Sequence, residues 1–218
     1  MKLVADSFAW PFRGEWRSRW FAGVLAVLFL PLLFVPLLGY AIDATRAAER
    51  DSTTGPPPWR LSARLLADGA WTALMLLVIA LPFALVYGPL TGFFVDTRVW
   101  SSSDAGLASL HARVLAAIVL ALPFGLALLL LMPHATAAFA ASGRPADLFD
   151  VSAAVRRVGA DFTTWNVAAA AIVTAWAIGA ACSGLLCVGV LPGVFYAILV
   201  SAHASAALHD KGPAQPAR

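Results

Sequence analysis

The residues of this sequence that could support covalent catalysis are two cysteines, thirteen serines and four histidines. Nucleophilic catalysis needs a Ser or Cys with a base within hydrogen-bond reach. Cys182 and Ser183 have no acid or histidine close in sequence, and only the fold could bring His111 to them. On a helix, Cys182 and Cys187 point in different directions and lie in apolar sequence, which is typical of small packing residues. We therefore predict no catalytic residue and no enzyme activity.

The histidines offer metal chemistry only if several ligands gather in space. A protein metal site usually needs three or four ligands at matched spacing. His203 and His209 fall on different faces of a helix, and His134 follows Met132-Pro133 with no second ligand nearby in sequence. No strand precedes a Gly-rich phosphate-binding loop. We therefore predict no metal, no nucleotide and no other cofactor.

Acidic side chains could instead carry protons or ions through a membrane, since ionisable residues at membrane depth are costly and often functional. Asp43 and Asp68 flank a basic loop and could pair with Arg46 and Arg64, as interfacial pairs that contribute little. Asp96 follows a Phe-Phe-Val sequence at the expected end of a crossing, where we interpret it as structural. No acid lies mid-span in the clean apolar segments described next, which disfavours a proton-coupled transporter.

The elements that must position these residues are apolar. Hydrophobic residues make up 61% of the 218 residues and charged residues 12%, far from the balance of a soluble surface. The net charge of +3 is spread along the chain, so we expect no nucleic-acid partner. The composition predicts an all-α, polytopic transmembrane helix bundle whose partner is the lipid bilayer.

Four segments are apolar enough to cross a bilayer, since about 20 residues span the hydrocarbon core. A Gly- and Pro-containing turn over 184–193 separates the last two. We expect a single transmembrane domain over 1–209, followed by a disordered tail over 210–218. The four predicted crossings are 71–95, 114–132, 165–185 and 190–208.

The apolar stretch over 21–42 is interrupted by Pro31 and Pro36, each of which removes a helical hydrogen bond. If this stretch re-enters on the side it left, thirteen of the fifteen Lys and Arg residues lie on one side of the membrane. If it crosses once, the more basic side carries only nine of them. Cytoplasmic loops are enriched in Lys and Arg. We therefore predict a proline-broken, re-entrant hairpin over 21–42, with both termini in the cytoplasm of a cell whose plasma membrane holds the protein. One kinked crossing is the alternative.

The connector before the third crossing has helical spacing of its own. Apolar residues recur on one face and polar residues on another, and Pro145 suits a first helical turn. We predict a cytoplasmic amphipathic helix over 145–158 that lies on the membrane surface or across the base of the bundle. Its apolar face comprises Leu148, Val151, Val155, Val158 and Phe162.

Short motifs follow one another along the chain, namely Trp10-Pro11-Phe12, Gly39-Tyr40, Pro58-Trp59, Asp68-Gly69 and a closing element that ends near His203. Their order and spacing resemble an uncharacterised prokaryotic membrane family, domain of unknown function 4013. The resemblance covers about residues 6–209, implies a polytopic architecture and supplies no activity. The closing element departs from the family, since His203 is followed by Ala-Ser-Ala. The resemblance singles out Trp10, Pro11, Phe12, Gly39, Tyr40, Pro58, Trp59, Asp68, Gly69 and His203 as candidate functional positions.

Two functions follow from these features. The first is a non-enzymatic scaffold or accessory subunit that packs against another membrane protein or against itself, because the crossings carry small residues such as Gly88 and Gly92. The second is a small permease or channel-like transporter subunit, because a broken helix such as 21–42 can line a cavity.

Overall fold

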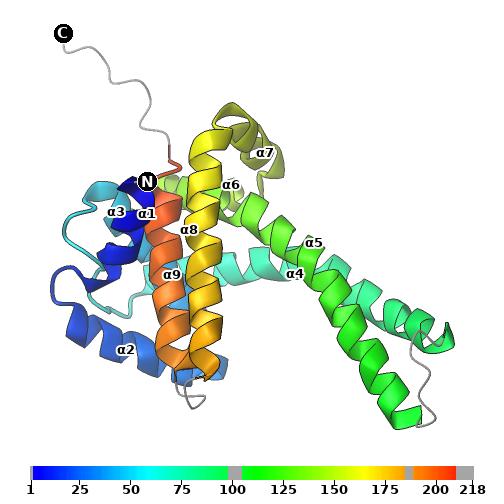
Figure 1. Ribbon diagram of the computed structural model, residues 1–218. Helices are drawn as coiled ribbons and strands as arrows, with labels where there is room; N and C mark the ends of the chain where they lie inside the picture. Colours follow the sequence, from blue (N-terminus) through cyan, green and yellow to red (C-terminus); the bar gives the residue numbers. More distant parts are fainter. Residues whose placement is uncertain (1, 98–104, 185–188, 210–218) are drawn as a thin grey trace. The chain divides into compact units, whose positions relative to one another are not determined.

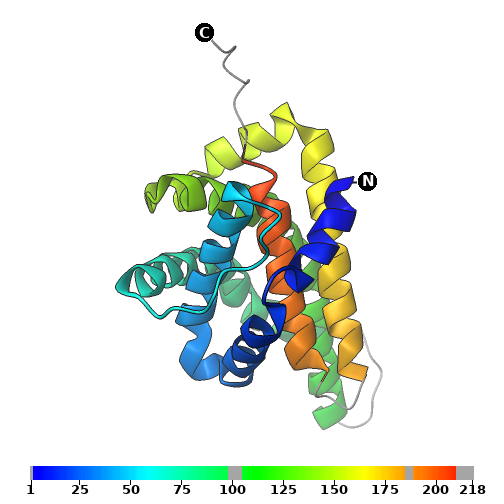
Figure 2. The same cartoon turned by 90° about the vertical axis from the view of Figure 1, so that its left-hand side faces the viewer.

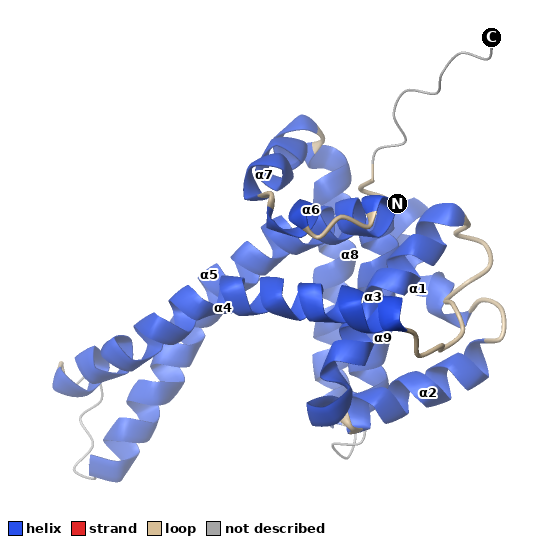
Figure 3. Cartoon of the chain, turned by 180° about the vertical axis from the view of Figure 1, so that it is seen from behind, coloured by secondary structure: helices blue, strands red, loops and turns tan. Residues whose placement is uncertain are grey.

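The computed structural model describes residues 2–97, 105–184 and 189–209. Helices account for 87% of these residues and no strand occurs among them, which confirms the predicted all-α class (Figures 1 and 3). The predicted disordered tail over 210–218, the loop around Ser102 and Cys187 lie outside the described residues.

Four helices are long and apolar enough to cross a membrane, so the chain is a multi-pass membrane protein. Three of them, together with a shorter apolar helix α9 (Val190–Ala206), overlap the four predicted crossings. The fourth, α3, contains the second half of the predicted broken hairpin. The four long helices are α3 (Leu30–Arg50), α4 (Ala63–Asp96), α5 (Ala105–Ser142) and α8 (Phe162–Ala181).

Two of these helices are longer than the hydropathy predicts. α4 begins at Ala63 instead of 71, and α5 runs from Ala105 to Ser142 around the predicted 114–132. Hydropathy reports the length that lipid can cover, whereas a helix ends where the backbone meets a capping or breaking residue. α5 ends at Gly143, whose φ of 69° is left-handed and stops the helix.

The described chain forms two compact units, and each is described by itself. The first unit contains residues 1–73 and 131–218, and the second contains residues 74–130. In the second unit, α4 and α5 pack through the rings of Phe83 and Phe124, whose centroids are 5.2 Å apart.

The N-terminal segment of the first unit is broken as Pro31 predicts. It forms α1 (Lys2–Ala9), a 3-10 turn η1 (Trp10–Phe12) and α2 (Trp16–Leu28), and the chain breaks at Phe29 before α3. Proline is accepted in a first helical turn because the missing N–H has no partner there. Pro36, in contrast, stays inside α3 without ending it.

The first unit is built around α9. α8 runs antiparallel to α9, and their backbones touch at Gly179 and Gly193, where an added Cβ would lie 2.8 Å from a backbone oxygen. α2 runs across α9 instead of along it (Figure 1), and Gly23 leaves room for the ring of Phe195. Small residues therefore set the close helix approaches of this unit.

Both ends of the N-terminal segment lie at the C-terminal end of α9. Near the start of the chain, Ser7 hydrogen-bonds to His203, and Figure 2 shows α1 lying against α8 and α9. Near the end of α3, Glu49 pairs with His209 at 3.4 Å. The segment thus descends beside α9 and returns to the level from which it started.

The segment predicted as one amphipathic helix divides at Asp150 into α6 (Ala146–Phe149) and α7 (Val151–Ala160). Asp150 caps α7 by accepting from the backbone N–H of Ala153 at 2.8 Å, and this hydrogen bond lowers the pKa of its carboxyl. Leu148 and Val158 are buried against the unit. The other predicted apolar residues, Val151, Val155 and Phe162, are exposed and available to lipid.

Candidate functional site

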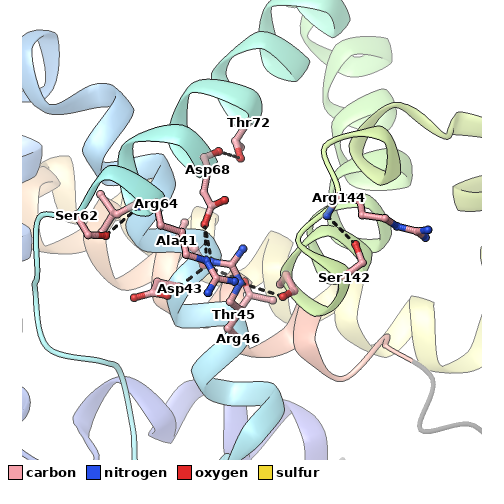
Figure 4. A network of polar contacts seen from close by, with 12 residues as sticks. Ala41, Asp43, Thr45, Arg46, Ser62, Arg64, Asp68, Thr72, Ser142 and Arg144 are labelled. Carbon is pink, nitrogen blue, oxygen red and sulfur yellow. Dashed lines mark hydrogen bonds and ion pairs between the residues drawn. The ribbon is translucent and has the colours of Figure 1, made fainter.

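The most deeply buried charges of the described chain are Arg46 on α3 and Asp68 on α4, which are 4% and 7% exposed. Their side chains form an ion pair, with Arg46 Nη1 donating to Asp68 Oδ2 at 2.5 Å (Figure 4). Arg46 Nε also donates to the carbonyl of Ala140 at 2.9 Å, on the last turn of α5. One guanidinium therefore joins three helices, and we call Arg46, Asp68 and the Ala140 carbonyl the polar joint.

Further groups surround the polar joint. Asp43 Oδ1 lies 3.7 Å from Arg46 Nη1, and Arg64 Nε lies 3.9 Å from Asp68 Oδ2. The guanidinium also lies 5.8 Å from the ring centroid of Phe139, within the range of a cation–π interaction. The predicted pairing of these acids with Arg46 and Arg64 is confirmed. Unlike most pairs at a membrane interface, however, Arg46 and Asp68 are covered by three helices and buried within the protein.

Two glycines allow the helix crossing that builds the polar joint. A Cβ on Gly39 of α3 would lie 1.9 Å from the carbonyl oxygen of Leu65, and a Cβ on Gly69 of α4 would lie 2.0 Å from that of Val35. The two backbones are therefore in direct contact. This contact brings the first turns of α4 close enough to α3 for Asp68 to reach Arg46.

Aromatic rings brace the same crossing. Tyr40 stacks on Trp59 with centroids 4.1 Å apart and planes 4° apart, and its hydroxyl donates to the carbonyl of Pro57 at 2.9 Å. Phe195 of α9 lies 6.0 Å from the Tyr40 ring. Pro58, next to these residues, is exposed.

The remaining predicted positions gather around α9, away from the polar joint. Trp10 and Pro11 are buried, and the Trp10 ring lies 5.4 Å from the ring of His203. A buried hydrogen bond of 2.9 Å joins His203 Nδ1 to Ser7 Oγ. Phe12 is 48% exposed and stacks on Trp20 at 5.2 Å. The ten predicted positions thus form two groups, one beside α9 and one at the α3–α4 crossing.

A second buried ionisable group, His134 on α5, has a different environment. It is 4% exposed, and neither ring nitrogen has a hydrogen-bond partner among the described residues. It lines a cavity of about 30 Å³ with Asp147, Asp150 and Arg157. This volume matches a single water molecule, and buried waters usually satisfy such polar atoms.

The arrangement of these groups suits structure better than chemical turnover. The opposite charges of Arg46 and Asp68 neutralise one another in the polar joint. An open cleft of about 400 Å³ lies beside Arg46, and its lining includes Glu49, Arg50, Ala140, Ala141 and His209. Over the described ranges, no three His, Cys, Asp or Glu side chains are grouped to hold a metal ion. What the polar joint can do is hold the start of α4 and the end of α5 against α3 within the first unit.

Sequence reasoning gave Arg46 no special role, and it missed Ser7 and the Ala140 carbonyl entirely. One signal was available for Arg46, because it lies three residues after Asp43 on a helix and the two side chains can form an ion pair. Nothing in the sequence could link Ser7 to His203 or Arg46 to Ala140, since these pairs lie far apart along the chain.

Comparison with known proteins gives one match. The model of the family described as Protein of unknown function (DUF4013) matches residues 23–188. No curated protein and no solved structure matches the chain. The matched range contains the polar joint, the α3–α4 crossing and all four long helices, and it stops short of α9.

Proposed function

Because this multi-pass membrane protein belongs to the family described as Protein of unknown function (DUF4013), which assigns no activity, we propose a role from its own surfaces. The protein is a non-enzymatic scaffold or accessory subunit that packs the α4–α5 helix pair against the transmembrane helices of another membrane protein. The polar joint holds the start of α4 and the end of α5 against α3.

The observation that carries this proposal is how little of α4 and α5 the chain covers. Only 6% of the most apolar window of each helix is buried, compared with 39% for α3 and 33% for α8. In lipid, helices associate through close packing of small residues and not through the hydrophobic effect. A long, uncovered helix pair is therefore a surface on which other helices can pack.

The second unit also presents small residues at suitable positions. A Cβ added at Gly88 or Gly92 of α4, or at Gly125 of α5, would meet nothing within 4 Å. In contrast, neighbouring backbone atoms already occupy the space beside the glycines that bring helices together in the first unit, as at Gly39 and Gly69. The second unit thus has uncovered small residues on its helices. These residues support the proposal that a helix of a partner protein packs there.

Photo-cross-linking in native membranes tests the proposal. A photoreactive residue at Leu85, which is 67% exposed on α4, should give a discrete cross-linked product with another membrane protein. Adding Gly88→Leu and Gly92→Leu should reduce that product by about tenfold, the equivalent of about 1.4 kcal/mol of helix packing.

Gly159→Leu is the matched control, because Gly159 of α7 also has nothing within 4 Å and lies outside the second unit. It should leave the cross-linked product unchanged. If Leu85 cross-links only to lipid, or if the double variant cross-links as well as the wild type, the scaffold proposal is contradicted.

We also propose that the protein lies in the plasma membrane with both termini in the cytoplasm. The re-entrant arrangement is supported by the return of the N-terminal segment to the end of α9, where Glu49 meets His209. That same end carries Arg46, Arg50 and the chain start, and Lys and Arg mark the cytoplasmic side.

The permease reading has weaker support. It rests on the break at Phe29, which would need to line a polar cavity. Its neighbours Leu28 and Leu32 are exposed and apolar, and neither cavity described above contains a residue from this region. We therefore prefer the scaffold.

A further inference from the structure

One flank of the first unit is polar over much of its height. It is formed by α1, by the residues that lead into α2, and by the loop after α3. Its side chains are exposed or half-buried. We call this surface the polar flank, and it comprises Lys2, Asp6, Arg13, Glu15, Arg17, Ser18, Asp51, Ser52, Thr53 and Thr54.

Ring contacts fix the level of the polar flank along α9. Phe12 and Trp20, on either side of Glu15–Ser18, lie 5.8 Å and 6.0 Å from the ring of Tyr196. The loop residue Ser52 lies nearer the C-terminal end of α9, because the Arg13 guanidinium that donates to its carbonyl at 2.7 Å also pairs with Asp6, beside the Ser7 that bonds His203. The polar flank therefore extends to the level of Tyr196.

Tyr196 is near the middle of the helix hairpin that we expect to cross the membrane. At about 1.5 Å per residue, it lies about 9 Å from the start of α9 at Val190 and about 15 Å from its end at Ala206. The antiparallel α8 is 20 residues long, or about 30 Å, which matches the hydrocarbon core. The lower part of the polar flank is therefore at the depth of lipid tails.

Several groups at this depth could not be accommodated by lipid. Long Arg and Lys side chains can extend to the interface, but the shorter carboxylate side chain of Glu15, which is exposed at this level, cannot. The backbone between α3 and α4 is also irregular, and it runs past Tyr40 to Trp59 (Figure 2). Non-helical backbone at membrane depth occurs only where protein or water satisfies it.

The opposite flank at the same level is apolar. Gly179 meets Gly193, and Ala175 packs with Ala197, so Ile178 of α8 lies close to the level of Phe195. Val173, Trp176 and Ile178 are all more than 40% exposed. One side of the α8–α9 hairpin thus suits lipid and the other does not.

We propose that the polar flank faces water inside the thickness of the membrane. An aqueous inlet opens on the side where the chain start and His209 lie and reaches beside α9 to the level of Tyr196. This inference does not depend on the scaffold proposal, which concerns the second unit, so either can fail while the other holds.

Cysteine accessibility in sealed vesicles tests the inlet. In a background with Cys182→Ala and Cys187→Ala, single cysteines are placed by Ser18→Cys in the lower part of the polar flank and by Thr53→Cys nearer its opening. Ile178→Cys places one on the apolar flank at a depth matched to Ser18. Ala160→Cys, exposed at the end of α7, reports which side the reagent reaches. The probe is a charged, membrane-impermeant maleimide.

The cysteines replacing Ser18 and Thr53 should react within about tenfold of the rate at Ala160 and from the same side, because the thiolate that reacts needs water. The cysteine replacing Ile178 should react at least about a hundredfold more slowly, because lipid suppresses thiolate formation. All four positions are exposed in the structure, so the variants should fold as the background does.

Three results would overturn the inlet. Protection of the Ser18 and Thr53 positions to the level of Ile178 would place the polar flank out of water. Fast labelling of Ile178 would show that this level lies outside the lipid. Labelling of Ser18 only from the side opposite to Ala160 would place the opening on the wrong face.

Discussion

At the scale of single residues, Arg46 is the side chain on which most of the described polar structure depends. It neutralises Asp68 and satisfies a carbonyl of the last turn of α5, a group that a helix end leaves without a partner. Burying two charges is costly, and their attraction offsets that cost only when the geometry is good. The pair therefore specifies which helices meet more than it adds to stability.

Removing one partner of this pair should be more damaging than removing both. We expect Arg46→Met to lower the free energy of unfolding by about 3 kcal/mol, because Asp68 is left buried with only the distant Arg64. The double variant Arg46→Met with Asp68→Leu should recover most of this loss. Thermal unfolding in detergent measures the loss in the single and double variants. As a control, Arg60→Met at an exposed position should change the free energy of unfolding by less than about 0.5 kcal/mol. Equal loss in the single and double variants would contradict the interpretation.

At the scale of elements, glycine positions decide which helices can touch. Gly39 with Gly69 and Gly179 with Gly193 both bring backbone against backbone, and both contacts lie in the first unit. Gly88 and Gly92 have the same helical spacing as a packing motif, yet among the described residues nothing lies within 4 Å of a Cβ added at either. Spacing alone therefore does not tell an internal contact from an open surface.

Side chains added at the α3–α4 crossing should force these helices apart. We expect Gly69→Val to destabilise the protein by about 2–4 kcal/mol, because its Cβ would overlap the carbonyl of Val35, which is rigid backbone. Gly88→Ala should instead be neutral or gain up to about 1 kcal/mol from helix propensity. Thermal unfolding of both variants in the same detergent is the measurement, and a tolerated Gly69→Val would show that the crossing is looser than described.

At the scale of the whole molecule, the N-terminal segment is the part whose course matters most for topology. Its two ends lie together at the end of α9, where Ser7 meets His203 and Glu49 meets His209. A single crossing would have separated these ends by the thickness of the membrane. The arrangement therefore favours re-entry over a kinked crossing.

Sidedness of labelling checks this topology. Cysteines from Ala5→Cys and Gly159→Cys, both at exposed positions, should react with an impermeant reagent from the same, cytoplasmic side. A cysteine from Ser102→Cys, outside the described residues, should react only from the other side. If Ala5 and Gly159 were labelled from opposite sides, the stretch over 21–42 would be a crossing and the re-entrant hairpin would be wrong.

The sequence by itself determined the solvent and the secondary structure of this protein. Apolar runs and scarce charge require lipid, and Pro31 requires a break near Phe29, because both are local consequences of composition and backbone chemistry. Only the tertiary structure decided that Arg46 and Asp68 are buried and that a polar flank extends to Tyr196. Burial and pairing depend on contacts between residues far apart in the chain, and spacing along one helix does not encode which neighbour will cover it.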